Sequence, residues 1–331
     1  MKLLAKSIID QRQTDIRKDL DVEGIEIILL GGELEKDNIK ATTEAFITLA
    51  EDFPVIGIEA PTSYKGLPVN PIAEDKVTRG ISRDYLQRCV DLTSQLRAKA
   101  NVEVYFQYQF AFGNYLPTGY PKQKVPLSYE LEQIASFHYA LESQCDFPIQ
   151  IENGTPIHLH NDFPAYRNST IRMSDFAQHC LPVALDICHL ALTLYTWSKA
   201  KPLTISLDSV KTPKGILAIE MTEEDRALGT RIAQEKNEQR TITNIIIEQI
   251  REYAPLIGSL QFSNAKPGFA TDELEESYAG SDGLIDIPRV LAEAIIPCNI
   301  PYVIPEYHEE DYCNPQHQRR IIPFVRALSQ R

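Results

Sequence analysis

Seven polar side chains lie at or just after the ends of apolar, strand-like runs, and most of them are acidic. They are Glu59 in IGIEAP, Glu152 in IQIENG, Asp186 and His189 in ALDICH, Gln261 and Asn264 in LQFSNAK, and Glu306 in VIPEYHEED. A buried carboxylate is costly unless it is paired or binds a cation, and converging carboxylates repel one another by several kcal/mol. A divalent cation is the simplest remedy, so these residues predict a metal site if the chain brings the runs together.

The runs belong to a repeating pattern that predicts how they are placed. Short apolar runs alternate with segments of helical period, which is typical of βαβ units around a parallel sheet. We expect strands at residues 3–9, 24–30, 55–59, 102–110, 148–152, 182–188, 257–262 and 302–306. We expect helices at residues 39–50, 82–98, 128–141, 174–179, 222–234, 243–253, 287–295 and 316–328. Eight such repeats imply an α/β fold, a closed (β/α)8 TIM barrel, whose active site forms at the C-terminal ends of the strands.

An open, doubly wound sheet is the competing architecture. It is less favoured because no GxGxxG follows the first run, and Gly31-Gly32 alone is a weak signal. Residues 198–224 are longer than a usual βα loop and contain two short alternating runs, at 203–207 and 216–219. We therefore predict a single (β/α)8 barrel domain over residues 1–331, with residues 198–224 as an insertion that forms a lid over the barrel mouth.

Composition restricts the partners of this domain. The chain has 331 residues, 43% of them hydrophobic, and its charge is 33 − 46 = −13. Such an excess of acid repels phosphate backbones and anionic lipids, so we expect a small-molecule substrate, no nucleic acid and no membrane. The six cysteines form no CxxC and no secretory leader precedes them, which predicts reduced thiols in the cytoplasm. The sequence leaves a homo-oligomer open.

The strand-end segments also carry a family resemblance. IENGTP, LDICH, LQFSNAKPG with a later GSDGLIDIP, and IPEYHEE resemble the fifth-to-eighth-strand signatures of the xylose-isomerase-like TIM-barrel superfamily, which holds sugar isomerases, sugar epimerases and apurinic endonucleases. The resemblance covers residues 148–308, about half the chain, and the EAP at residues 59–61 is similar to the third-strand motif. It implies four metal ligands and one substrate-binding histidine. Carried over by position, the ligands are Glu152, Asp186, Gln261 and Glu306, and the histidine is His189.

The sequence departs from the family pattern at Gln261, where the family usually has histidine. An amide oxygen suits a hard cation better than it suits zinc, so the expected cofactor is Mn²⁺ or Mg²⁺, with Zn²⁺ as the alternative. The endonuclease branch builds its zinc cluster from further histidines. Here Glu59 takes the third-strand position and Asp272-Glu273-Leu274 stands where that branch has Asp-Arg-His. With the charge of −13, these differences argue against DNA cleavage.

The leading hypothesis is a metal-dependent isomerase or epimerase that acts on a small sugar or polyol-carbonyl compound through an enediolate. A cation binds two adjacent substrate oxygens, and two carboxylates move a proton at the carbon next to the carbonyl. We assign that proton transfer to Glu152 and Glu306. Substrate contacts are expected from five further residues: His189, Lys266, Glu59, Gln107 and Asn264.

Other interpretations remain open. A hydrolase or an oxygenase can use the same metal site, because a strand-end site fixes geometry and not reaction class. A non-catalytic barrel that binds a metabolite, with its metal site decayed at Gln261, is the alternative from another class. Structural roles also compete: Asp186 as a helix N-cap, His189 as a core residue, Gln261 and Asn264 as ordinary hydrogen-bonding residues. His158 and His160 have a spacing that could bind a metal from an extended segment, but histidines of a surface loop are the favoured interpretation.

Overall fold

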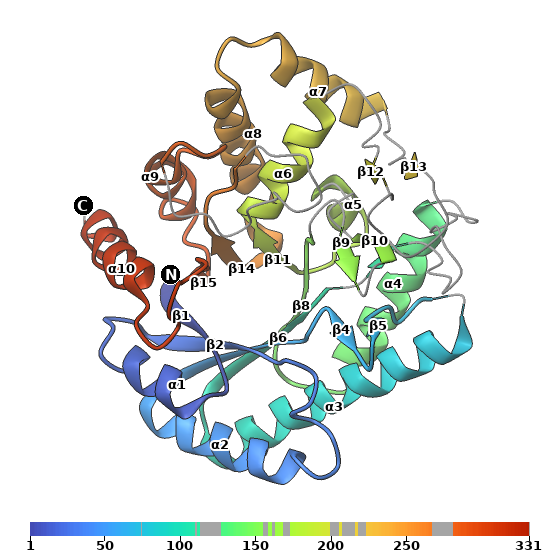
Figure 1. Cartoon of the computed structure of the whole chain (residues 1–331), viewed down its shortest axis with the longest axis vertical. Coiled ribbons are helices and arrows are strands. Elements are labelled where there is room, and N and C mark those ends of the chain that lie inside the picture. The colour runs from blue at the N-terminus through green and yellow to red at the C-terminus, as the bar shows by residue number, and fades with distance from the viewer. Residues whose placement is uncertain are drawn as a thin grey trace.

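Eight parallel strands close into a barrel in the computed structural model of the chain (Figure 1). The structure describes residues 1–73, 75–109, 111–112, 127–154, 158–160, 163–167, 173–198, 205–206, 216–217, 223–266 and 281–330. Around the barrel the strands follow the order β1-β15-β14-β11-β8-β6-β3-β2, so β1 pairs with both the second and the last strand of the chain. The predicted (β/α)8 barrel is therefore confirmed, and the open doubly wound sheet is excluded.

All eight barrel strands lie where the sequence predicts them. They are β1 (Lys2–Ile8), β2 (Gly24–Ile28), β3 (Val55–Glu59), β6 (Glu103–Tyr108), β8 (Ile149–Glu152), β11 (Val183–Asp186), β14 (Ile257–Phe262) and β15 (Tyr302–Pro305). Short antiparallel pairings add to the loops: β4 (Ser63–Tyr64) with β5 (Leu67–Pro68), and β10 (Phe163–Arg167) with both β7 (Ala111–Phe112) and β9 (His158–His160).

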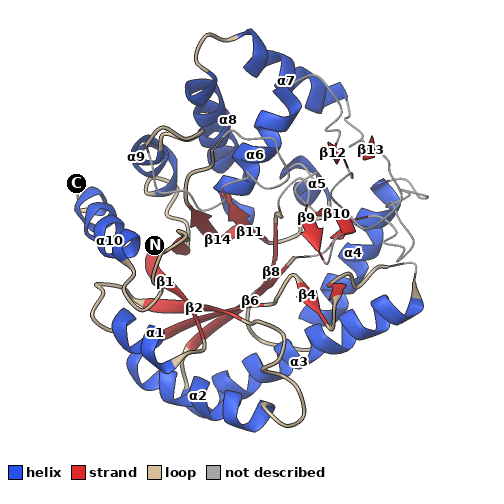
Figure 2. Cartoon of the chain, viewed as in Figure 1, coloured by secondary structure: helices blue, strands red, loops and turns tan. Residues whose placement is uncertain are grey.

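Helices surround the strands, as Figure 2 shows. They are α1 (Gln11–Arg17), α2 (Ile39–Asp52), α3 (Lys76–Ala100), α4 (Leu127–Glu142), α5 (Met173–Gln178), α6 (Ile187–Ser198), α7 (Glu223–Gln234), α8 (Glu238–Tyr253), α9 (Ile287–Val290) and α10 (Gln316–Ser329), with a 3-10 turn η3 (Ala254–Leu256) and a π turn η4 (Leu291–Ile295). Among the described residues, no helix is both long enough and apolar enough to cross a membrane.

Two helices, α1 and α6, have no counterpart among the predicted segments. Helix α6 is buried on nearly every side, where it packs against α7, α8 and β14, so its sequence ICHLALTLYTWS lacks the amphipathic period that marks a surface helix. Helix α1 is only seven residues long, and its start is set by a side-chain cap: Asp10 accepts a hydrogen bond from the backbone N–H of Gln13 at 3.0 Å.

The proposed lid lies mainly outside the described residues. Within the insertion, β12 (Ile205–Ser206) and β13 (Ile216–Leu217) pair as antiparallel strands, and they fall in the two alternating runs noted above. Residues 199–204, 207–215 and 218–222 are outside the described part of the chain. The lid therefore stays a prediction.

Apolar side chains fill the barrel interior toward the N-terminal ends of the strands, and polar residues occupy the C-terminal ends. Five side chains form the cluster inside the barrel: Leu4, Val55, Tyr105, Tyr302 and Ile304. The Tyr105 and Tyr302 rings stack with centroids 4.5 Å apart. Gly57 makes room for this stack, because a Cβ there would lie 2.3 Å from Cζ of Tyr105. A separate, larger apolar core lies between the strands and the surrounding helices.

Two helical glycines give a matched test of this packing. A Cβ added at Gly229 in α7 would lie 2.2 Å from the backbone oxygen of Trp197 in α6, whereas a Cβ added at exposed Gly80 in α3 meets nothing within 4 Å. We expect Gly80→Ala to raise the free energy of unfolding by about 0.5–1 kcal/mol through helix propensity. Gly229→Ala should lower it by about 1–3 kcal/mol through overpacking. Urea titration measures both, and a stabilised Gly229→Ala would contradict the close approach of α6 and α7.

Candidate active site

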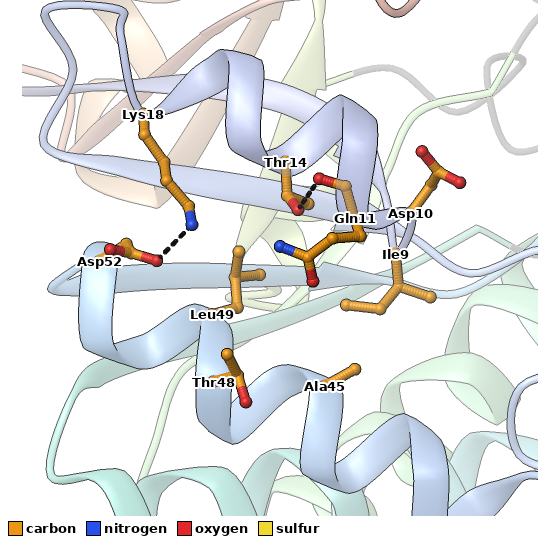
Figure 3. Close-up of a pocket in the computed structure, with 9 residues that line it drawn as sticks. All are labelled: Ile9, Asp10, Gln11, Thr14, Lys18, Ala45, Thr48, Leu49 and Asp52. Atoms are coloured by element: carbon orange, nitrogen blue, oxygen red, sulfur yellow. Dashed lines mark hydrogen bonds and ion pairs between the residues drawn. The ribbon is translucent and has the colours of Figure 1, made fainter.

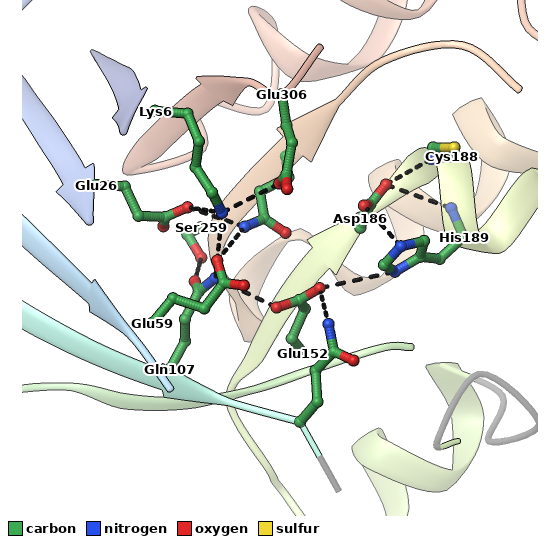
Figure 4. Close-up of polar contacts among 12 residues, drawn as sticks. Lys6, Glu26, Glu59, Gln107, Glu152, Asp186, Cys188, His189, Ser259 and Glu306 are labelled. Atoms are coloured by element: carbon green, nitrogen blue, oxygen red, sulfur yellow. Dashed lines mark hydrogen bonds and ion pairs between the residues drawn. The ribbon is translucent and has the colours of Figure 1, made fainter. Parts of the chain in front are cut away.

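The barrel brings the predicted strand-end acids to one mouth. Glu59, Glu152 and Asp186 are the last residues of β3, β8 and β11, and Glu306 directly follows β15. In-register pairing places Asp186 beside Gln261 of β14 and Ala184 beside Glu152. Figure 4 shows the side chains of Glu59, Glu152, Asp186 and Glu306 gathered near one another. They divide into two groups of potential ligand atoms, each within 4.8 Å of one another.

The first group, which we name the His189 cluster, consists of Glu152, Asp186 and His189. Nε2 of His189 lies 3.3 Å from Oδ2 of Asp186, and Nδ1 lies 3.6 Å from Oε1 of Glu152. All three side chains are nearly inaccessible to solvent. Asp186 has a structural role as well, because its Oδ1 accepts the backbone N–H groups of Cys188 and His189 at the start of α6. One oxygen of the Asp186 carboxylate therefore caps the helix, and the other faces His189.

Asn153 fixes the orientation of the histidine. Its backbone oxygen lies 2.7 Å from Nδ1 of His189, which makes Nδ1–H the donor, and its side chain clamps the backbone of Asp186 with bonds of 2.7 and 2.9 Å. In the neutral imidazole the Nε2 lone pair then faces the Asp186 carboxylate, an arrangement that needs a proton or a cation between the two atoms. A histidine that binds a metal typically donates its other N–H to such a carbonyl. The His189 cluster therefore fits a divalent metal.

The second group, which we name the Lys6 cluster, contains a lysine among three glutamates. Nζ of Lys6 lies 2.8 Å from Glu26 and 3.1 Å from Glu306, and it also donates to Oε2 of Glu59. Lys6 and Glu26 sit side by side on β1 and β2. The side chain of Glu306 is 26% exposed, against 9% or less for the other three, so Glu306 faces the mouth.

Neutral amide and phenol groups donate hydrogen bonds to these acids. Nε2 of Gln261 donates to Glu26 at 2.8 Å and to Glu59 at 3.1 Å. Nε2 of Gln107 donates to Glu59 at 3.0 Å and to Glu152 at 3.4 Å, so it links the two clusters. Two further donors are Gln109, which donates to Oε1 of Glu152, and the Tyr105 hydroxyl, which donates to Glu26 at 2.6 Å.

Burial and mutual repulsion shift the protonation of the acids. Burial raises the pKa of Glu59 to about 7, against the opposing effect of Lys6. Burial, and then the charge of Glu59, raise the pKa of Glu152 well above its ordinary value. The pKa of Glu306 is also raised by burial, although the ammonium of Lys6 opposes this. For Lys6, burial works to lower the pKa, but the surrounding carboxylates, Glu26 first, raise it well above the usual range. Carboxyl groups in such surroundings suit proton transfer near neutral pH.

The four ligands carried over from the superfamily therefore fall on both clusters. Glu152 and Asp186 lie with His189, while Glu306 pairs with Lys6 and the amide nitrogen of Gln261 faces Glu26 and Glu59.

The other expected contacts are spread around the mouth. Asn264 is occupied with the backbone of Ile285 and Ala265, at 2.8 to 2.9 Å, so it holds the segment after β14. Lys266 lies two residues further, partly buried. His158 and His160 lie in β9, and their side chains fall outside what the structure describes.

Sequence reasoning missed Lys6, Glu26, Tyr105 and Gln109. For the first two a signal existed: Lys6 in LLAKSII and Glu26 in GIEII are charged residues in the interior of mainly apolar strands. An isolated charge there is costly to bury without a partner, and the two charges are opposite and lie on adjacent strands. Once the barrel is predicted, the pairing of Lys6 with Glu26 can therefore be predicted as well.

A small cavity lies apart from this chemistry. Its volume is about 120 Å³, and it opens between α1 and α2, where Lys18 bridges to Asp52 at 2.8 Å (Figure 3). The residues around it are Ile9, Asp10, Gln11, Thr14, Lys18, Ala45, Thr48, Leu49 and Asp52. None of the strand-end acids lines it, so the cavity has no part in the candidate site.

Comparison with solved structures finds the same fold in other chains. The chain is similar over 100% of its length to a D-tagatose 3-epimerase-like protein, with 98% of that chain covered, a TM-score of 0.59 and 13% identity. It is similar over 99% of its length to D-allulose 3-epimerase from Methylomonas sp. in complex with D-allulose, with 96% of that chain covered, a TM-score of 0.56 and 9% identity.

A third structure with this fold is a Thermus thermophilus protein from a crystal soaked with ZnCl2. The similarity covers 100% of this chain and 98% of the Thermus chain, with a TM-score of 0.51 and 14% identity. No family model matches the chain, and no curated protein matches it in sequence. At identities of 9 to 14%, the similarity of these solved structures to the chain is one of fold.

Proposed function

We propose that the chain is a metal-assisted isomerase or epimerase that acts on a small sugar or a similar polyol-carbonyl compound. The observation that carries the proposal is the His189 cluster, in which two buried carboxylates and a correctly oriented imidazole converge at the barrel mouth beside Glu306. The substrate class is supported by a D-allulose 3-epimerase that shares the fold and whose structure is a complex with D-allulose.

Glu152, Asp186 and His189 would hold the metal, and a bound divalent ion supplies Lewis-acid polarisation of a substrate carbonyl. With an imidazole in this set, Zn²⁺ is as suitable as Mn²⁺, and the oxygen donors still permit Mg²⁺. The residues of the chain supply the proton transfer. Glu306, at the open side of the Lys6 cluster, removes the proton next to the carbonyl, and Glu152 is the second carboxylate, which returns one.

A metabolite-binding barrel without catalysis is the second candidate. It is favoured by one observation, the engagement of two expected ligands elsewhere: Glu306 pairs with Lys6, and Gln261 turns its nitrogen toward carboxylates. The two candidates make different predictions for metal binding and for hydrogen exchange. A metabolite-binding barrel with a decayed metal site would bind no divalent ion and would not exchange substrate hydrogen with solvent.

Metal binding has a direct test in thermal unfolding. After treatment with EDTA, addition of Mn²⁺, Zn²⁺ or Mg²⁺ should raise the melting temperature, because ligand at a hundredfold excess over Kd adds about 2.7 kcal/mol of stability. Asp186→Asn should abolish the effect, since asparagine keeps the N-cap and removes the charge. Asp84→Asn, at an exposed position in α3, is the matched control. A melting temperature that no divalent ion changes would favour the metabolite-binding barrel.

Turnover is tested with pentoses, hexoses, their phosphates and inosose-like ketones in deuterated solvent. The proposed reaction exchanges the hydrogen next to the carbonyl, so deuterium should enter the substrate during isomerisation. The absence of both turnover and deuterium incorporation, with every metal tried, would reject the isomerase.

A further inference from the structure

The Lys6 cluster resembles a metal site that already contains a cation. The ligand oxygens of Glu26, Glu59 and Glu306 lie within 4.8 Å of one another, and the ammonium of Lys6 contacts all three. A surface ion pair joins two exposed side chains, whereas here one buried ammonium serves three carboxylates from three strands. Lys6 donates hydrogen bonds to Glu26 and Glu59 and forms an ion pair with Glu306, so its ammonium is engaged by all three carboxylates.

Gln261 gives a second, independent indication. This side chain is fully buried, its nitrogen lies 2.8 and 3.1 Å from Glu26 and Glu59, and its Oε1 has no hydrogen-bond partner among the described residues. A buried amide oxygen without a partner costs free energy, and it is normally satisfied by a donor or a cation. Rotation of the amide would add this oxygen to the three carboxylates, which makes an all-oxygen set of the kind that hard divalent cations prefer.

We propose that Lys6 is a built-in substitute for a divalent cation, and that removing its ammonium turns Glu26, Glu59, Glu306 and Gln261 into a binding site for Mn²⁺ or Ca²⁺. In the native chain the ammonium holds Glu59 and Glu306 in place, so no metal enters this cluster. The side chain of Glu306 is 26% exposed, and this opening toward the mouth gives an ion a route in. The inference does not depend on the proposed isomerase activity, because it concerns only how many ions the chain binds.

The test is the number of Mn²⁺ ions bound per chain, with MnCl2 as the only added ligand after removal of metals with EDTA. Titration followed by electron paramagnetic resonance counts bound Mn²⁺ directly. Lys6→Ala, which removes the charge and leaves space, should bind one more ion per chain than the native protein. Mn²⁺ and Ca²⁺ should also raise the melting temperature of Lys6→Ala more than that of the native chain. Zn²⁺ should do so less, because this site has no imidazole or thiolate.

Three variants serve as controls. Lys6→Met removes the charge but fills the space, so it should gain no ion. Lys2 lies on the same face of β1 as Lys6 and pairs with exposed Glu103. Lys2→Ala should therefore bind no additional ion. Adding Glu26→Gln to Lys6→Ala should abolish the extra ion.

An equal number of ions in Lys6→Ala and the native chain would overturn the proposal. So would a Lys6→Ala chain that stays unfolded at every Mn²⁺ concentration, because the ion is expected to supply what the ammonium supplied. Failure of the isomerase assay would leave this count unchanged, which keeps the two proposals separate.

Discussion

Glu306→Gln should reduce the exchange of substrate hydrogen with deuterated solvent by about 10²–10⁴-fold, while substrate affinity stays within about tenfold. A lost general acid or base typically costs that much in rate and far less in ground-state binding. Glutamine keeps the size of the side chain and can still contact Lys6 through its amide oxygen, so the chain should fold. The side chain of Glu306 is 26% exposed, the largest exposed fraction in the Lys6 cluster, so Glu306 is the acid that a ligand at the mouth reaches first.

Glu310→Gln provides the control for this experiment. The same substitution four residues further on, at an exposed position, should leave exchange and affinity unchanged. Metal binding by Glu306→Gln separates two roles. If Glu306 moves protons, the Mn²⁺ affinity of the variant should remain close to that of the native chain. If Glu306 is the fourth metal ligand, as the family pattern implies, the affinity should fall with the rate.

The eight barrel strands could be predicted because each is a short apolar run, and most helices could be predicted because each has a clear hydrophobic period. Strand β3 and strand β14 lie at the very residues expected from their apolar runs, 55–59 and 257–262. Helix α6 could not be found in the same way. It is buried on nearly every side, and a helix without a polar face has no 3.6-residue period to read.

The site was predictable only as far as strand ends determine it. Glu152 and Asp186 end adjacent strands, and parallel strands bring such residues together. The separation into two clusters depends on side-chain partners that lie far apart in sequence, such as Lys6 with Glu306. Lys6 lies in the middle of its strand and points into the barrel, so a list of residues at strand ends does not contain it. The orientation of His189 depends on a backbone oxygen, that of Asn153, which leaves no mark in a sequence pattern.

The stability of the chain should depend on pH through the buried carboxyl of Glu59. Its native pKa of about 7 exceeds the ordinary value of 4.5 because the carboxyl is buried, and a difference of that size corresponds to roughly 3 kcal/mol. Between these two values the native chain binds more protons than the unfolded chain. The contribution of Glu59 to stability is therefore fully present below pH 4.5 and is lost as the pH rises to about 7.

Glu59→Gln isolates this effect, because glutamine is similar in shape to the protonated acid and does not titrate. In the presence of EDTA, the free energy of unfolding of the native chain, minus that of the variant, should fall by roughly 3 kcal/mol between about pH 4.5 and about pH 8. Urea titrations at several pH values measure it, with Glu44→Gln on the exposed face of α2 as the control for which the difference stays constant. A constant difference for Glu59→Gln as well would mean that Lys6 keeps Glu59 ionised throughout, and that the ammonium outweighs the cost of burial. The pH at which the difference changes therefore measures the balance between burial and Lys6 at the centre of the barrel.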